Sequence, residues 1–183
     1  MSDDNQTISE SSQLQTLRWQ FQLTWRLAGL HLPKLTDTAC RWEPTPGCWT
    51  VRQSADGIWQ PDWIVPEPDP PPPVTIAWLT WHLIWWWSGL LAAFRNERPS
   101  AHDEVAWPGS AAAVVQRLES LSREWAEVLS GLNEDDLDRP FAYPWKEPRP
   151  LRLALAWANS ELMKNIAEIG TIRHLFEATR QFR

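Results

Sequence analysis

The residues whose types and spacing could do chemistry lie in two segments of the chain. His82 stands among tryptophans in the segment 74–95. In the segment 151–180, Glu161 and Glu168 are seven residues apart, which places both carboxylates on one face of a helix. A histidine from one helix that meets two carboxylates from another would suit a hard metal ion or acid–base catalysis.

The polar face of segment 151–180 lies beside its apolar face rather than opposite it. At 100° per residue, one quadrant holds five residues: Trp157, Glu161, Lys164, Asn165 and Glu168. A structural interpretation competes with a chemical one. Either glutamate could accept a hydrogen bond from a buried His82, and Glu161, Lys164 and Glu168 could form exposed ion pairs. One imidazole with carboxylates is a sparse ligand set, so we favour the structural interpretation.

Other chemistries leave no pattern in the sequence. The chain has neither a Gly-x-Gly phosphate-binding motif nor a serine, cysteine or threonine in the context of an activated nucleophile. The net charge is −6 and no basic cluster is present, so we do not expect the protein to bind nucleic acid. His31, His102 and His174 fall in loops or at a helix end, where we expect surface residues.

Helices must position these residues. Apolar residues recur at spacings of three and four in three segments, 13–30, 110–130 and 151–180, with Ser110 as an N-cap, and the apolar segment 74–95 is expected to be a further helix. Without a convincing strand pattern, this predicts an all-α four-helix bundle formed by residues 13–183 as one domain. The polar residues 1–12 are expected to be a disordered tail.

A long connection rich in proline and tryptophan, residues 31–73, joins the first two helices. We expect a helical turn near residues 36–41 and a small hairpin around Asp56 and Gly57. Its four tryptophans would be costly to leave in water, so the connection should pack over a surface or cavity. They are Trp42, Trp49, Trp59 and Trp63.

Two further features bear on where the protein resides. Residues 74–94 carry no formal charge and are long enough to cross a bilayer, but their central tryptophans and His82 favour a helix buried in protein instead. The acidic N-terminus lacks the pattern of a secretion signal, so we expect a cytoplasmic location. There Cys40 and Cys48 would stay reduced, although a short disulfide between them is sterically conceivable.

Six motifs in order resemble the DinB/YfiT-like superfamily over residues 14–180. They are RWEPTPGCWTVR at 41–52, PEPDP at 66–70, IAWLTWH at 76–82, WPGS at 107–110, DDLDRP at 135–140 and NSELMKNIAEI at 159–169. The resemblance implies a four-helix bundle, a homodimer and a divalent metal held by three histidines. It also implies activities such as thiol S-transfer or isomerisation with a low-molecular-weight thiol.

The metal ligands of that family carry over only in part. The histidine of the second helix matches His82, whereas Trp157, Lys164 and Asn165 stand where the pattern places histidine on the last helix. Glu161 and Glu168 stand at the positions where the family pattern places glutamate. The resemblance therefore implies either that the metal has been lost, which we favour, or that a degenerate site of His82, Glu161 and Asn165 remains.

Three hypotheses for function follow. The first is a metal-free bundle that binds a small ligand or partner in a pocket lined by Trp49, Trp78, His82, Trp85, Trp157, Glu161, Asn165 and Glu168. The second is a thiol-dependent transferase or isomerase that uses zinc or nickel, with His82 as a ligand and Glu161 or Glu168 as a ligand or base. The third is an interaction protein with an exposed tryptophan patch. None of the three requires nucleic acid or a membrane.

Overall fold

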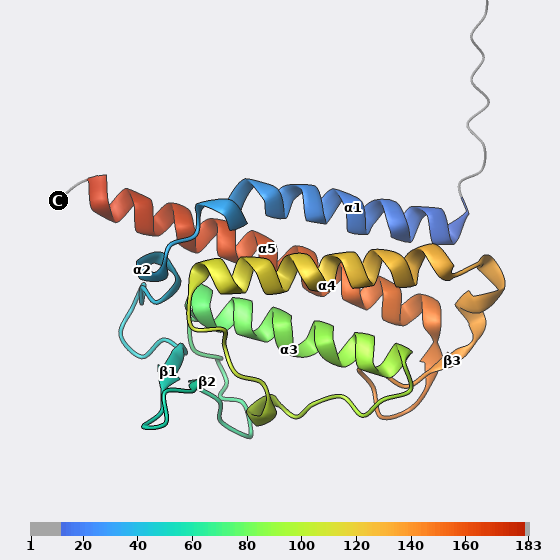
Figure 1. The fold of residues 1–183 in the computed structure, drawn as a ribbon, viewed down its shortest axis with the longest axis horizontal. Helices are drawn as coiled ribbons and strands as arrows, with labels where there is room; N and C mark the ends of the chain where they lie inside the picture. Colours follow the sequence, from blue (N-terminus) through green and yellow to red (C-terminus); the bar gives the residue numbers. More distant parts are fainter. Residues whose placement is uncertain (1–11, 182–183) are drawn as a thin grey trace, which may run out of the picture.

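Four long helices dominate residues 12–181, the part of the chain that the computed structural model describes. They are α1 (Gln13–His31), α3 (Ile76–Phe94), α4 (Ala111–Gly131) and α5 (Leu151–Gln181). Helix α5 packs against α1 and α3, and α3 also packs against α4. Figure 1 shows the four helices lying side by side. The predicted all-α four-helix bundle is confirmed, and the helix bounds differ from the predicted ones by one or two residues.

Short polar side chains fix the starts of three helices. The Ser12 hydroxyl accepts a hydrogen bond from the backbone N–H of Gln15, so Ser12 of the predicted tail is the N-cap of α1; residues 1–11 lie outside the described residues. Ser110 caps α4 as predicted, and Thr75 caps α3. Such caps satisfy N–H groups that have no partner within the helix.

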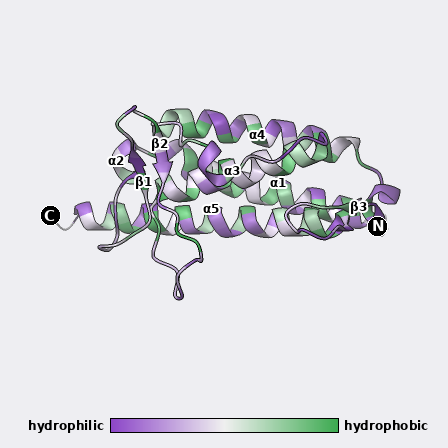
Figure 2. Cartoon of the chain, turned by 90° about the horizontal axis from the view of Figure 1, so that it is seen from below, coloured by the Kyte–Doolittle hydropathy of each residue, from purple (hydrophilic) through white to green (hydrophobic). Residues whose placement is uncertain are grey.

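The core is built from the apolar faces of α1, α4 and α5, with α3 enclosed between them. The residues on the predicted apolar faces of α1, α4 and α5 are buried, except that Trp25 and Val128 are half-buried. They are Leu14, Leu17, Phe21, Trp25 and Ala28 in α1, Ala111, Val114, Leu118, Leu121, Trp125 and Val128 in α4, and Leu151, Leu155, Ala158, Leu162, Ile166, Ile169 and Phe176 in α5. Trp25 still packs edge-on against Trp87 with ring centroids 5.8 Å apart. In Figure 2, hydrophobic and hydrophilic segments alternate along α4 and α5, as expected for helices with one buried face. Helix α3 is buried on most sides, which explains its uncharged sequence.

The connection between α1 and α3 is ordered and packs against the bundle. It contains a short helix, α2 (Asp37–Cys40), and an antiparallel hairpin of β1 (Val51–Gln53) and β2 (Trp59–Pro61), which confirms the predicted turn and hairpin. Gly57 has a φ of +81° in the hairpin turn, a conformation that favours glycine. Asp37 accepts a hydrogen bond from the N–H of Ala111 and so ties α2 to the start of α4.

A second small hairpin precedes α5. After α4 the chain forms a 3₁₀ turn (Glu134–Asp138) and pairs β3 (Pro140–Phe141) with β4 (Arg149–Pro150). Helix α1 supplies the missing cap at the end of α4, because the Arg18 guanidinium donates to the carbonyls of Leu129 and Leu132. Both ends of α4 are thus held by neighbouring elements.

Both cysteines are buried and free, so the conceivable short disulfide does not form. Burial raises the pKa of the Cys40 thiol to about 12, which keeps it protonated and unreactive. Within residues 12–181, no helix combines the length and the apolar character needed to cross a membrane.

Two helical glycines give a test of how tightly the hairpin loop after β3 packs on α3. A Cβ added at Gly89 would lie 2.8 Å from the hydroxyl of Tyr143, whereas one at Gly29 in α1 would meet nothing within 4 Å. We expect Gly89→Ala to destabilise the protein by about 1–2 kcal/mol, because Tyr143 must move. Gly29→Ala should instead stabilise it by up to about 1 kcal/mol. Urea unfolding measures both; equal stabilisation by the two variants would contradict this packing.

Candidate functional site

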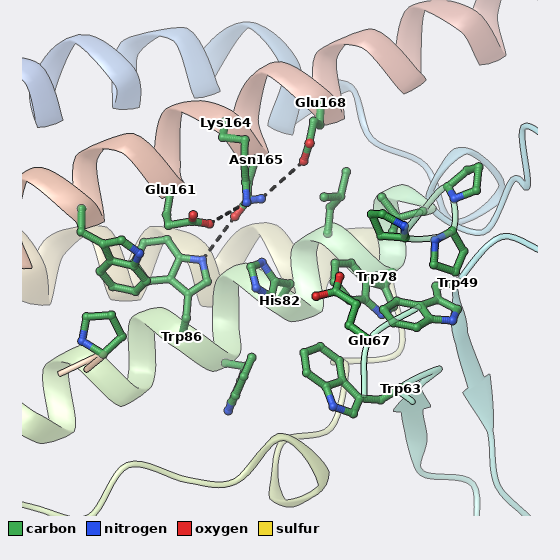
Figure 3. A pocket seen from close by; sticks show the side chains of 18 of the residues that line it. Trp49, Trp63, Glu67, Trp78, His82, Trp86, Glu161, Lys164, Asn165 and Glu168 are labelled. Carbon is green, nitrogen blue, oxygen red and sulfur yellow. Dashed lines mark hydrogen bonds and ion pairs between the residues drawn. The ribbon is translucent and has the colours of Figure 1, made fainter. Parts of the chain in front are cut away.

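A cavity of about 540 Å³ lies between α3, α5, the α1–α3 connection and the loop that joins β3 to β4. All eight residues predicted for a ligand pocket line it: Trp49, Trp78, His82, Trp85, Trp157, Glu161, Asn165 and Glu168. Figure 3 shows the side chains of α5 projecting toward His82 on α3. The structure thus brings together residues that are more than a hundred positions apart in the sequence.

Sequence reasoning missed several residues of the cavity wall. Trp63 and Glu67 come from the connection, Trp86 from α3, and Tyr143 from the loop after β3. A signal for the first two was present, because Trp63 was expected to pack over a cavity and Glu67 lies within the quoted PEPDP motif. Irregular segments have no periodicity to show which way a side chain points.

Stacked aromatic rings form one end of the cavity. Trp63 lies parallel to Trp78 with centroids 6.1 Å apart and meets Trp85 edge-on at 5.4 Å. Trp49 stacks on the same Trp63 ring at 5.9 Å. Trp49 also packs on Trp78 at 5.7 Å, so two rings of the irregular connection join it to α3. Each such pair adds about 0.5–1.5 kcal/mol beyond the burial of its area.

The indoles of α3 that line the cavity are anchored by hydrogen bonds from their N–H groups to the protein. Trp78 donates to the carbonyl of Asp62 at 2.9 Å, and Trp85 donates to the carbonyl of Ser100 at 3.0 Å. Trp86 donates to Oδ1 of Asn165 on α5 at 3.2 Å. These rings are held rigidly, and their N–H groups are already used.

His82 is a neutral imidazole packed against tryptophan. Its ring lies parallel to Trp78 at 5.2 Å, and its Nδ1 atom is buried with no hydrogen-bond partner in the structure. Burial and, secondarily, the charge of Lys164 lower the pKa of His82 to about 4, against the opposing effect of Glu161. The expectation that Glu161 or Glu168 satisfies this ring is not met, because neither carboxylate is bonded to it in residues 12–181.

The polar side chains of α5 are largely paired with their own neighbours. Glu161 forms a 2.8 Å ion pair with Lys164, which agrees with the structural interpretation of this part of the face. Asn165 accepts from Trp86 and donates over 3.5 Å to Glu168. Glu168 has no salt bridge among the described residues.

The residues at the family's metal positions do not fit a three-ligand metal centre. Trp157 packs edge-on against Trp86 at 5.3 Å and offers no lone pair, while Lys164 is a paired cation. Asn165 Oδ1 already accepts from an indole. Across residues 12–181, no group of three or more histidine, cysteine, aspartate or glutamate side chains is arranged to hold a metal ion. The loss of the metal remains a prediction, and the orphaned His82 Nδ1 is the one atom that favours a ligand role.

The remaining histidines differ in part from the expectation of surface positions. His102 is half-buried and stacks on Trp63 at 5.2 Å, directly behind the cavity wall. His31 is also half-buried, because it packs over Gly170 near Arg173. His174 is exposed as predicted. In both exceptions a contact from a distant segment covers the ring.

Comparisons with known proteins agree with the bundle. A family model described as the DinB superfamily matches residues 20–169. A crystal structure of a conserved protein from Enterococcus faecalis is similar in fold, with a TM-score of 0.59 at 12% sequence identity; the match covers 88% of this chain and 95% of that one. A search of curated proteins gave no match.

The environment of His82 predicts a pH dependence of stability. Its pKa is about 4 in the folded protein, against 6.5 for an ordinary histidine, so the unfolded chain takes up the proton first as pH falls. The contribution of His82 to the free energy of unfolding is therefore constant above about pH 6.5. It falls by up to about 3 kcal/mol as the pH is lowered from 6.5 to 4. We expect His82→Gln to lack this component in urea unfolding at several pH values.

Gln116→Ala, which removes an uncharged, exposed side chain from α4, is the control and should keep the wild-type pH profile. Proton NMR of the His82 ring supplies a direct reading of its titration. A midpoint near 6.5, the ordinary histidine value, in the folded protein would contradict the burial of this imidazole.

Proposed function

This chain belongs to the DinB superfamily, and we propose that it acts without a metal, by enclosing a small organic molecule in the cavity between α3, α5 and the connection. The volume of about 540 Å³ lies within the usual range for ligand sites, about 300–1,000 Å³. Tryptophan, tyrosine and proline side chains make up most of the wall, and polar groups converge on it, as is common in such sites.

One observation carries the proposal: aromatic packing and local pairing occupy the positions where the family resemblance places metal-binding imidazoles. Trp157 meets Trp86 and Tyr143 edge-on, with centroids 5.3 and 5.8 Å apart. The Asn165 amide holds the Trp86 indole. These residues shape and stiffen a wall, and a preformed wall favours binding because little ordering is needed when a ligand enters.

A second function has one observation in its favour. The buried Nδ1 of His82, without a partner, is the kind of atom that a metal ion would use. A zinc- or nickel-dependent transferase or isomerase with a small thiol would take His82 as a ligand and Glu161 or Glu168 as a ligand or base. For Glu161 to act in this way, its 2.8 Å ion pair with Lys164 would first have to break.

The homodimer and the cytoplasmic location are further parts of this proposal. Several apolar side chains of α1 are exposed and could be covered by a second chain or, under the third hypothesis, by another protein. They are Trp19, Leu27 and Leu30.

Metal content separates the first two functions. We expect elemental analysis of the purified protein to find zinc and nickel well below one per chain, because the donor set around His82 is incomplete. Titration calorimetry with either ion should then show no saturable site. One ion per chain that disappears in His82→Ala would overturn the metal-free proposal in favour of the transferase.

Ligand binding is tested on the chelator-treated protein. A thermal-shift screen of neutral, cationic and anionic small molecules should give stabilising compounds whose effect is lost in Trp63→Ala, because Trp63 forms part of the cavity wall. Trp42→Ala is the matched control, since Trp42 is also half-buried in the connection but does not line the cavity. Circular dichroism checks that both variants fold. Compounds that bind Trp63→Ala as well as the wild type, or only after metal is added, would contradict the proposal.

A further inference from the structure

Negatively charged side chains outnumber positively charged ones around the cavity. Three carboxylates line it, Glu67, Glu161 and Glu168, against the single ammonium of Lys164. Lys164 is already paired with Glu161 at 2.8 Å. Glu67 and Glu168 have no salt bridge within residues 12–181. The cavity therefore presents two negative charges that the surrounding side chains do not neutralise.

The two unpaired carboxylates approach the cavity from different elements. Glu67 extends from the connection and lies close to Trp78 in the view of Figure 3, while Glu168 projects from α5 toward the same space. Glu168 receives only the 3.5 Å contact from the Asn165 amide. A ligand between α5 and the connection would have a carboxylate on each side.

On the α3 side of the cavity, the hydrogen-bond donors of the wall are already used. The indole N–H groups of Trp78, Trp85 and Trp86 all donate to protein oxygens. The Tyr143 hydroxyl donates to the backbone carbonyl of Trp86 at 2.8 Å. The α3 side of the cavity is thus carbon and π surface, and the charge facing it is negative. Such a site suits a ligand that brings its own positive charge.

Aromatic surface adds to this preference. The faces of indole rings carry negative potential and attract an organic cation within about 6 Å. Trp49, Trp63 and Trp78 gather at one end of the cavity, the end at which Glu67 enters (Figure 3), and Trp85 meets Trp63 edge-on at 5.4 Å. Two independent features, the excess of carboxylates and the cluster of indoles, therefore favour the same class of ligand.

We propose that the molecule held in this cavity is an organic cation, a substituted ammonium group whose charge lies between Glu67 and Glu168 and against the tryptophan cluster. This inference rests on the proposed function, because it names the chemical class of its ligand. An anion would meet the unneutralised carboxylates without a free cation to receive it. An inorganic cation would lack ligands, because these carboxylates belong to no group of three or more metal-binding side chains in residues 12–181.

Choline and its uncharged isostere, 3,3-dimethylbutan-1-ol, test the inference, because they differ chiefly in the charge of the central atom. Quenching of tryptophan fluorescence is measured on the chelator-treated protein at constant ionic strength. We expect choline to bind at least about tenfold more tightly than the alcohol. Quenching should be absent for acetate, which carries the opposite charge.

Charge variants locate the site. Glu168→Gln should weaken choline binding by about threefold to tenfold while leaving the alcohol unchanged, and adding Glu67→Gln should weaken it further. Glu119→Gln is the matched control, since it removes a charge from an exposed position on α4 that does not line the cavity. A thermal unfolding curve for each variant checks that the fold is intact.

The outcomes separate this inference from the proposed function. The cation proposal is wrong if choline and the alcohol bind equally well, or if Glu119→Gln and Glu168→Gln weaken choline binding to the same extent. Either result is still compatible with a pocket that binds another small molecule. If neither choline nor the alcohol binds, the cation proposal is also wrong. The pocket itself is then judged by the Trp63→Ala comparison, which uses compounds of every charge.

Discussion

The rest of the structure depends on one constraint: the indole N–H groups of α3 need hydrogen-bond acceptors. Helix α3 carries five tryptophans and is covered by other elements on most sides. A buried donor left without a partner costs about 1–3 kcal/mol. Four of the five find oxygens on segments far along the chain: Trp78 on Asp62, Trp81 on Val105, Trp85 on Ser100 and Trp86 on Asn165. Helix α3 therefore fixes the connection, the loop before α4, and α5.

The cavity is a consequence of these same bonds. Because Trp78, Trp85 and Trp86 turn their N–H groups toward a loop or toward α5, they present carbon and π surface to the cavity. The connection is held there as a wall, because the backbone N–H of Trp49 donates to the carbonyl of Pro73 and its carbonyl accepts from Thr75. Trp63 then stacks on Trp78 and closes that end. An irregular, proline-rich segment thus becomes a rigid part of a site.

The polar residues of α5 show how a structural role and a chemical role compete for one side chain. Asn165 occupies a position where the family resemblance places an imidazole, yet its amide is the acceptor for Trp86 and the donor to Glu168. Lys164 neutralises Glu161. His82 keeps a buried ring nitrogen unpaired. What α5 offers the cavity is negative charge and shape, and our proposal of ligand binding rather than metal chemistry is built on this.

Periodicity in the sequence was enough to define the helices and much of the site. Spacings of three and four located α1, α4 and α5, and a long apolar run located α3, all to within two residues. The quadrant from Trp157 to Glu168 identified the face of α5 that lines the cavity. Contacts in the folded chain were needed to establish how Trp63, Glu67 and Tyr143 join that face, and that His31 and His102 are covered. These residues lie in irregular segments or at a helix end, where the direction of a side chain depends on contacts with distant parts of the chain.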